Sequence, residues 1–174
     1  RHGASYVSDQ NDKDLIMEAE EERDMGWDEI KKQLEEFEVK AVKVGIQSGD
    51  TTADGKESLA YVAWLHEFGS PGGMIPQRSF IRAGTEEKQG DIESKYEELG
   101  PAIFNAGANA EQMLNILGQE ATAIIQNKIT SGPFTPDSPE TIRRKGSSSP
   151  LIDTGHMRAS VRHVVCGADD FSSD

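Results

Sequence analysis

His66 and Glu67 are adjacent and resemble the start of a catalytic metal-binding motif. In one large class of zinc proteases, such a pair lies on a helix that presents a second histidine four residues after the first. That position is Ser70 here, so the zinc-binding helix face is incomplete. Two further histidines, His156 and His163, lie near the C-terminal end, and with a single cysteine they form no dense ligand cluster. We therefore expect no metal site.

Nucleophilic catalysis also lacks its sequence signals. The chain contains no Gly-x-Ser-x-Gly motif, and Cys166 follows two valines with His163 as its nearest basic neighbour, which favours an inert thiol. The glycine-rich residues 69–73 lack the Lys-Ser/Thr pair of a phosphate-binding loop. The many carboxylates of residues 18–38 are expected on a charged helix face and not in a pocket that tunes their pKa. The sequence predicts no enzyme and no cofactor site.

Composition and charge narrow the class of protein further. The 174 residues suit one domain, and a net charge of −13 argues against nucleic-acid binding over the whole surface. A single cysteine excludes an intrachain disulfide. No run approaches the ~18 apolar residues that a membrane span requires, and no signal segment opens the chain, so we expect no membrane partner.

An acidic segment precedes the rest of the chain. Between Asp9 and Glu38 there are 13 acidic and 4 basic residues, a net charge of −9. Gly26 is expected to separate a weak helix around residues 15–19 from an amphipathic helix. The apolar stripe of that second helix is formed by Trp27, Ile30, Leu34 and Phe37. We assign residues 1–38 to an acidic helical arm, whose charges face either water or DNA or a basic partner.

The elements that follow are a strand and a capped helix. Residues 39–46 alternate between apolar and polar side chains and predict a strand, and residues 48–55 have the composition of a loop. Ser58 is placed to cap a helix that ends at Gly69. Its apolar face carries Tyr61, Leu65 and Phe68.

Helical periodicity dominates the second half. One stripe ends at Gly100, and Pro101 suits the first turn of a new long helix whose apolar residues recur from Ile103 to Ile124. Ser138 is expected to cap a shorter helix, before a flexible hinge and a final strand. These last segments are residues 147–150 for the hinge, 157–166 for the strand and 167–174 for a disordered acidic tail.

These elements predict an α+β fold. The two strands are far apart in the sequence, so their pairing would close the fold end to end. We expect residues 39–166 to form one domain, with a small antiparallel or mixed sheet packed against the long helix and the shorter helices.

A basic patch interrupts the acidic sequence. Residues 135–165 contain five basic and three acidic residues, and Arg143, Arg144 and Lys145 are adjacent. Such a patch could contact phosphate, but it lacks the interleaved aromatic residues of a single-strand-binding surface. Contact with an acidic neighbouring subunit is the favoured interpretation.

Three segments together resemble the tail-completion or tail-component family of tailed bacteriophages, the small neck proteins between head connector and tail. The first is a V-G-I strand at 44–46 followed by H-E-F-G at 66–69. The second, residues 75–82, is similar to the family's I-P-x-R-P-F turn, with Ser79 in place of proline, which we expect to loosen that turn. The third, residues 150–161, is close to P-L-x-D-T-G-x-L/M-R-x-S-I/V.

The resemblance covers about residues 39–166 and marks residues that maintain the fold or contact the next subunit. Gly69 is expected to need a positive φ, and Arg78 to form a bidentate pair with a carboxylate. Asp153 or Thr154 is expected to cap a turn, with Arg158 returning to Asp153. The full set is His66, Glu67, Phe68, Gly69, Pro76, Arg78, Phe80, Leu151, Asp153, Thr154, Gly155, Met157, Arg158 and Ser160.

The resemblance implies a structural virion protein that assembles in the host bacterial cytoplasm as a ring of six or twelve copies. Its expected partners are a head connector or adaptor ring, a tail terminator or tail tube, and genomic DNA that passes without specific binding. The alternatives are a tail terminator or other tail-tube-end ring, an acidic regulatory binding protein, and a hydrolase. A hydrolase would need a nucleophile and a base close together, and the sequence offers no such cluster. Of the long loops at 48–57, 70–75 and 133–150, at least one is expected to become ordered only against a neighbouring ring.

Overall fold

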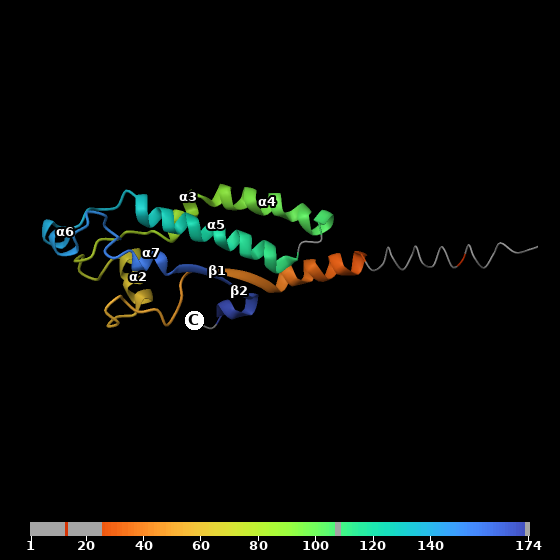
Figure 1. The fold of residues 1–174 in the computed structure, drawn as a ribbon, viewed down its shortest axis with the longest axis horizontal. Coiled ribbons are helices and arrows are strands. Elements are labelled where there is room, and N and C mark those ends of the chain that lie inside the picture. The colour runs from red at the N-terminus through yellow and green to blue at the C-terminus, as the bar shows by residue number, and fades with distance from the viewer. Residues whose placement is uncertain (1–12, 14–25, 107–108, 173–174) are drawn as a thin grey trace, which may run out of the picture.

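The computed structural model describes residue 13, residues 26–106 and residues 109–172. The molecule is elongated, with α6 at one end and the helix of residues 26–39 at the other (Figure 1). After that helix the order is β1 (Lys40–Ile46), α2 (Leu59–Phe68), α3 (Arg82–Glu87), α4 (Gln89–Ala106), α5 (Ala110–Ser131), α6 (Pro139–Lys145), α7 (His156–Ala159), β2 (Val161–Gly167) and the 3₁₀ turn η1 (Ala168–Ser172). The fold is α+β, as the sequence predicts.

A two-stranded antiparallel sheet joins the beginning and the end of this fold. β1 pairs with β2 in a register that places Val44 opposite His163 and Ile46 opposite Val161. The long helix α5 packs along both strands. Its Gly118 makes the close approach possible, because a Cβ at this position would lie 2.5 Å from the ring of His163.

The apolar core lies where α2, α5 and β2 meet the segments around α7. Phe80, which lies between α2 and α3, and Ile125 of α5 are completely buried. Eight buried residues form this cluster: Leu59, Ala63, Phe80, Ile125, Ile129, Leu151, Met157 and Val161.

The predicted long helix is two helices. The helix of Ile92 and Tyr96 continues through Pro101 as α4, and α5 starts separately at Ala110. A capping box starts α5, since Asn109 accepts a hydrogen bond from the backbone N–H of Gln112 and the Gln112 side chain accepts one from the backbone N–H of Asn109. The periodic apolar pattern continues across this break, so periodicity alone predicted the wrong start.

The predicted strand over 157–166 is wrong in its first part. Gly155 adopts a left-handed conformation (φ 80°) and α7 follows it, so β2 starts only at Val161. The disordered tail expected from residue 167 is also corrected, because Ala168–Ser172 form a 3₁₀ turn. The carboxylate of Asp170 accepts a hydrogen bond from the backbone N–H of Gly167 and holds this turn against the strand.

The ends of the shorter helices agree with the local sequence signals. Ser58 accepts a hydrogen bond from the backbone N–H of Tyr61, and Gly69 ends α2 with φ 81°. Ser138 caps α6 in the same way, with Pro139 in its first turn.

The predicted arm is not separate from the domain over its described part. Residues 26–39 form a helix that leads directly into β1. The side-chain oxygen of Gln33 accepts a 2.8 Å hydrogen bond from the backbone N–H of Ala110, and Lys40 pairs with Glu111 at 3.2 Å. The weaker helix predicted around residues 15–19 lies outside the described residues.

Candidate functional site

Glu67 is the centre of the first cluster of motif residues. Its side chain is buried on the inner face of α2 and accepts hydrogen bonds from the Ser79 hydroxyl (2.5 Å) and from the backbone N–H groups of Phe80, Ile81 and Arg82 (2.9, 2.9 and 3.1 Å). The four donors belong to the segment that leads into α3, and only Arg82 is part of that helix. A carboxylate with this many donors holds two chain segments together.

Ser79 tightens this turn, contrary to the sequence expectation. Its hydroxyl donates to Glu67 and also accepts a 3.3 Å hydrogen bond from the backbone N–H of Ala83. A serine in place of proline therefore adds two side-chain hydrogen bonds to the segment.

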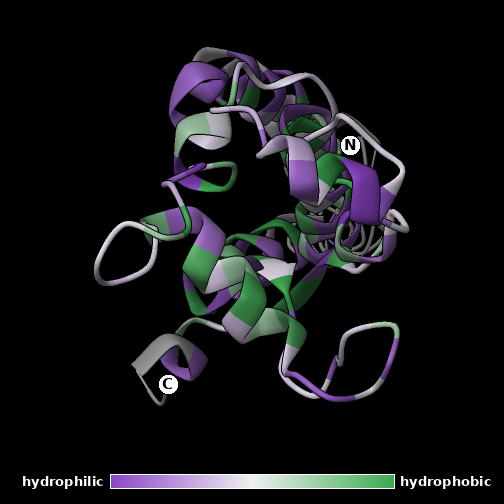
Figure 2. Ribbon diagram, turned by 90° about the vertical axis from the view of Figure 1, so that its left-hand side faces the viewer, coloured by the Kyte–Doolittle hydropathy of each residue, from purple (hydrophilic) through white to green (hydrophobic). Residues whose placement is uncertain are grey.

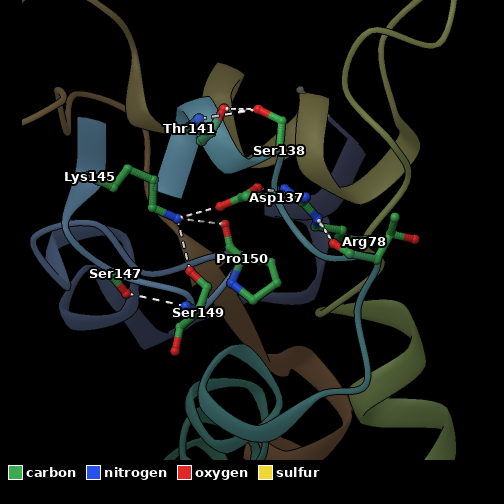
Figure 3. Close-up of polar contacts among 9 residues, drawn as sticks. Arg78, Asp137, Ser138, Thr141, Lys145, Ser147, Ser149 and Pro150 are labelled. Carbon is green, nitrogen blue, oxygen red and sulfur yellow. Dashed lines mark hydrogen bonds and ion pairs between the residues drawn. The ribbon is translucent and has the colours of Figure 1, made fainter. Parts of the chain in front are cut away.

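A buried ion-pair triad forms the second cluster (Figure 3). The guanidinium of Arg78 donates to Asp137 (2.7 Å) and to the carbonyl of Thr135 (3.0 Å), so it does not form the predicted bidentate pair. Lys145 approaches the other oxygen of Asp137 at 2.6 Å and also donates to the carbonyls of Ser149 and Pro150. The predicted hinge at 147–150 is thus fixed to α6.

Asp137 remains a carboxylate in this environment. Burial alone would raise its pKa, but the hydrogen bond from Lys145 and the charge of Arg78 outweigh burial, and the pKa lies below its usual value. Only 7% of the Asp137 side chain and 4% of the Arg78 side chain are exposed. Removal of either charge would leave the other buried without full compensation.

His66 lies beside this triad in a cleft of about 720 Å³. Its Nδ1 atom is buried and has no hydrogen-bond partner among the described residues. Burial lowers the pKa of His66, and the positive charges of Arg78 and Lys145 lower it further, although Asp137 acts in the opposite direction. The imidazole is therefore neutral at pH 7.

The third motif supplies core residues and a turn. Leu151 and Met157 are buried in the same cluster as Phe80. The hydroxyl of Thr154 accepts a 3.3 Å hydrogen bond from the backbone N–H of His156, which agrees with the predicted turn at Gly155, although this turn lacks a side-chain helix cap.

The predicted return of Arg158 to Asp153 is wrong. The Nε of Arg158 donates to the carbonyl of Gln126 in α5 at 3.4 Å, so this side chain connects α7 to the long helix. Asp153 lines the cleft beside the ion-pair triad. Ser160 is the C-cap residue of α7.

The basic patch is smaller than predicted. Lys145 is inside the triad and only 9% of its side chain is exposed. Arg143 and Arg144 are exposed on α6, and neither guanidinium group forms a hydrogen bond or ion pair with a described residue. Two free guanidinium groups therefore remain at this end of the molecule.

An exposed apolar surface lies on α2. On α2, Tyr61, Trp64 and Phe68 form a row of rings with centroids 6.2 and 5.7 Å apart, and about half of each side chain is exposed. Figure 2, which looks at the α6 end along the long axis, shows hydrophobic and hydrophilic helical turns both reaching the outside of the molecule. The predicted apolar face of α2, with Tyr61, Leu65 and Phe68, is therefore not the buried one. The helix buries Leu59, Ala63 and Glu67 instead.

This aromatic row was missed in the sequence as a surface. Its signal was the spacing of three and four between rings on a helix whose other face is also apolar.

Comparisons with known proteins add no identification. No family model, no curated protein and no solved structure matches the chain. Within the described residues, no group of three or more metal-ligating side chains is positioned to hold a metal ion, and none of the helices is long and apolar enough to cross a membrane.

Proposed function

We propose that the chain is a structural virion protein of a tailed bacteriophage, which forms a ring at the neck, completes or joins the tail, and lets DNA pass. Convergence of the three motif segments is the observation that supports this proposal. Glu67 of the first segment binds the backbone of the second, and Phe80 of the second packs with Leu151 and Met157 of the third. Residues that resemble the neck family thus act together as a scaffold.

The charge of the chain is compatible with such a passage. Six copies would carry a formal charge of 6 × −13 = −78. A like-charged opening would repel DNA phosphates and prevent the genome from adhering to the ring. The acidic residues 12–38 are our candidates for the lumen or the rim, although much of that segment lies outside the described residues.

Native mass spectrometry of the purified protein, combined with negative-stain images, is the first test. We expect six or twelve copies in a closed ring with a central opening. Where the phage that encodes the chain can be grown, purified particles should contain the protein, and a gold-labelled antibody should bind at the neck. Absence of the chain from purified particles would refute the proposal, and label at the far end of the tail would favour a tail-tube-end ring instead.

A further inference from the structure

The helix of residues 26–39 presents one face to solvent that combines apolar and acidic side chains with Lys31, whose Nζ lies 5.8 Å from the centre of the Trp27 ring and 3.7 Å from the carboxylate of Asp28. Trp27, Leu34 and Glu38 follow at intervals of seven and four and therefore share a face. Trp27 is 53% exposed and Leu34 is 40% exposed. Glu38 and the neighbouring Glu35 are exposed, and neither pairs with a described residue. Gln33, about a third of a turn away around the helix from Trp27 and Leu34, accepts the hydrogen bond from the first residue of α5.

The other end of the molecule carries two cations that pair with no described residue, and the cleft beside them is also lined by Asp54, Glu57 and Asp153. Arg143 and Arg144 lie free on α6, and Arg144 also lines the cleft beside it. Met74 and Ile75 form an apolar part of the same cleft, and Met74 is 88% exposed. This end therefore offers cations beside an uncovered apolar surface, whereas the helix of residues 26–39 offers carboxylates beside apolar side chains.

We propose that these two ends bind each other in successive copies of the chain. The outer face of residues 26–39 of one subunit packs against α6 and the cleft of the next, with Glu35 and Glu38 facing Arg143 and Arg144. The surfaces are at opposite ends of the long axis (Figure 1), so one chain cannot join them by itself. A contact between two different surfaces is heterologous, and repetition of it generates a ring when the rotation closes.

This inference rests on the proposed ring and specifies its subunit contact. It assigns Glu35 and Glu38 to that contact, so the charges at the lumen or the rim would come from the other acidic residues of 12–38. Opposite charges would orient the encounter and fix the register, and burial of Trp27 and Leu34 would supply the apolar part of the interface. DNA is the competing occupant of the arginine pair, because two exposed guanidinium groups can also contact phosphates.

Charge exchange between the two ends tests the contact. One variant carries Arg143→Glu and Arg144→Glu, and a second carries Glu35→Lys and Glu38→Lys. Each variant alone should assemble at least tenfold more weakly than the unmodified chain, because its two ends then carry like charges. An equimolar mixture should regain the ring with the two variants alternating, which native mass spectrometry detects as equal numbers of the two masses.

A control variant carries Glu86→Lys and Glu97→Lys, both exposed and away from the proposed contact, and should assemble normally. A Trp64→Phe background leaves Trp27 as the only indole, and its fluorescence should shift to shorter wavelength when the ring forms.

The outcomes separate the contact from the ring. If the unmodified chain forms a ring and both reversal variants form it equally well, the contact is wrong while the ring stands. Loss of DNA binding by the arginine variant, with assembly unchanged, would assign the arginines to phosphate and overturn the inference. A mixture that stays unassembled although each variant is folded would also overturn it. If the unmodified chain remains monomeric and the mixture forms no heterodimer, both the ring and the contact are refuted.

Discussion

At the scale of single residues, Glu67 replaces a cap that α3 does not have. The residue before α3 is Ile81, whose side chain accepts no hydrogen bond, and the free N–H groups at this helix start point instead at a carboxylate from α2. The negative charge also lies at the positive end of the short helix. One side chain thus fixes the distance and the angle between two helices.

Substitution of Glu67 by glutamine should therefore cost about 1–3 kcal/mol of unfolding free energy, because one acceptor oxygen becomes a donor that faces backbone N–H groups. Urea unfolding followed by circular dichroism measures the loss. The matched control is Glu97→Gln, at an exposed position of α4, which should change stability by less than about 0.5 kcal/mol. Equal stability of the two variants would contradict the capping role.

The lowered pKa of His66 predicts that the stability of the fold depends on pH. Its pKa is lowered in the folded state, so the unfolded chain binds a proton more readily, and stability falls as pH decreases below the unfolded value of about 6.5. Asp137 acts in a lower window, since its lowered pKa confers stability that is present above about pH 4 and is lost as pH falls through the folded pKa.

A His66→Phe variant separates these two effects. Its urea midpoint should remain flat between pH 6.5 and 5, where the unmodified chain loses stability, while the loss below pH 4 should remain in both proteins. A parallel decline of both proteins between pH 6.5 and 5 would show that another group titrates there.

The conformations and contacts of some of these residues could be predicted from the sequence, and those of others could not. The positive φ of Gly69 and the carboxylate partner of Arg78 follow from residue type and local motif. The identity of that partner, Asp137, and the removal of Lys145 from the basic patch depend on contacts between distant segments, for which one sequence contains no local signal.

At the scale of elements, the contact between α5 and β2 depends on one missing side chain. Gly118 lies in the middle of α5, where glycine weakens a helix, and its place is explained by the ring of His163 packed against it. The ring is further fixed by a 3.2 Å contact with Asn115 from the preceding turn.

We expect Gly118→Ala to destabilise the fold by about 1–3 kcal/mol despite the better helix propensity of alanine, because the new methyl group overlaps the imidazole. Gly90→Ala in α4 is the control, since a Cβ there meets nothing within 4 Å. That variant should be neutral or more stable by up to about 1 kcal/mol. Thermal unfolding of both variants measures the difference, and a stable Gly118→Ala protein would mean that β2 can move away from α5.

Element prediction succeeded where the signal was short and failed where two signals competed. β1 follows from the alternation of its side chains, and α2 and α6 follow from the serine caps that precede them. The start of α5 at Ala110 was missed because the apolar period continues across the break, although the Asn109 and Gln112 capping pair marks it in the sequence. α7 was missed because four residues are too few to establish a helical period against an alternating pattern.

At the scale of the whole molecule, we expect the long loops and the two ends to form the contacts between subunits. Segment 70–75 contains the 88% exposed Met74 and borders the cleft that we assign to the neighbouring subunit. Segment 133–150, in contrast, is held within the subunit by the ion pairs of Asp137.

Hydrogen exchange of free and assembled protein should distinguish these segments. We expect residues 26–38 and 70–75 to gain protection on assembly, whereas the α5 amides should be the most protected in both states. Full protection of the loops at 48–57, 70–75 and 133–150 in the free subunit would contradict ordering by a neighbour.

The pairing of β1 with β2 also sets when the chain can fold during its synthesis. Ala41 and Cys166 are paired across the sheet although they are 125 residues apart. At typical ribosomal rates of about 5–20 residues per second, β1 leaves the exit tunnel roughly 6–25 s before its partner strand does. From the completion of α5 at Ser131 until β2 is made, the face of α5 that packs against β2 lacks that strand. Products of premature termination before β2 therefore cannot close the sheet.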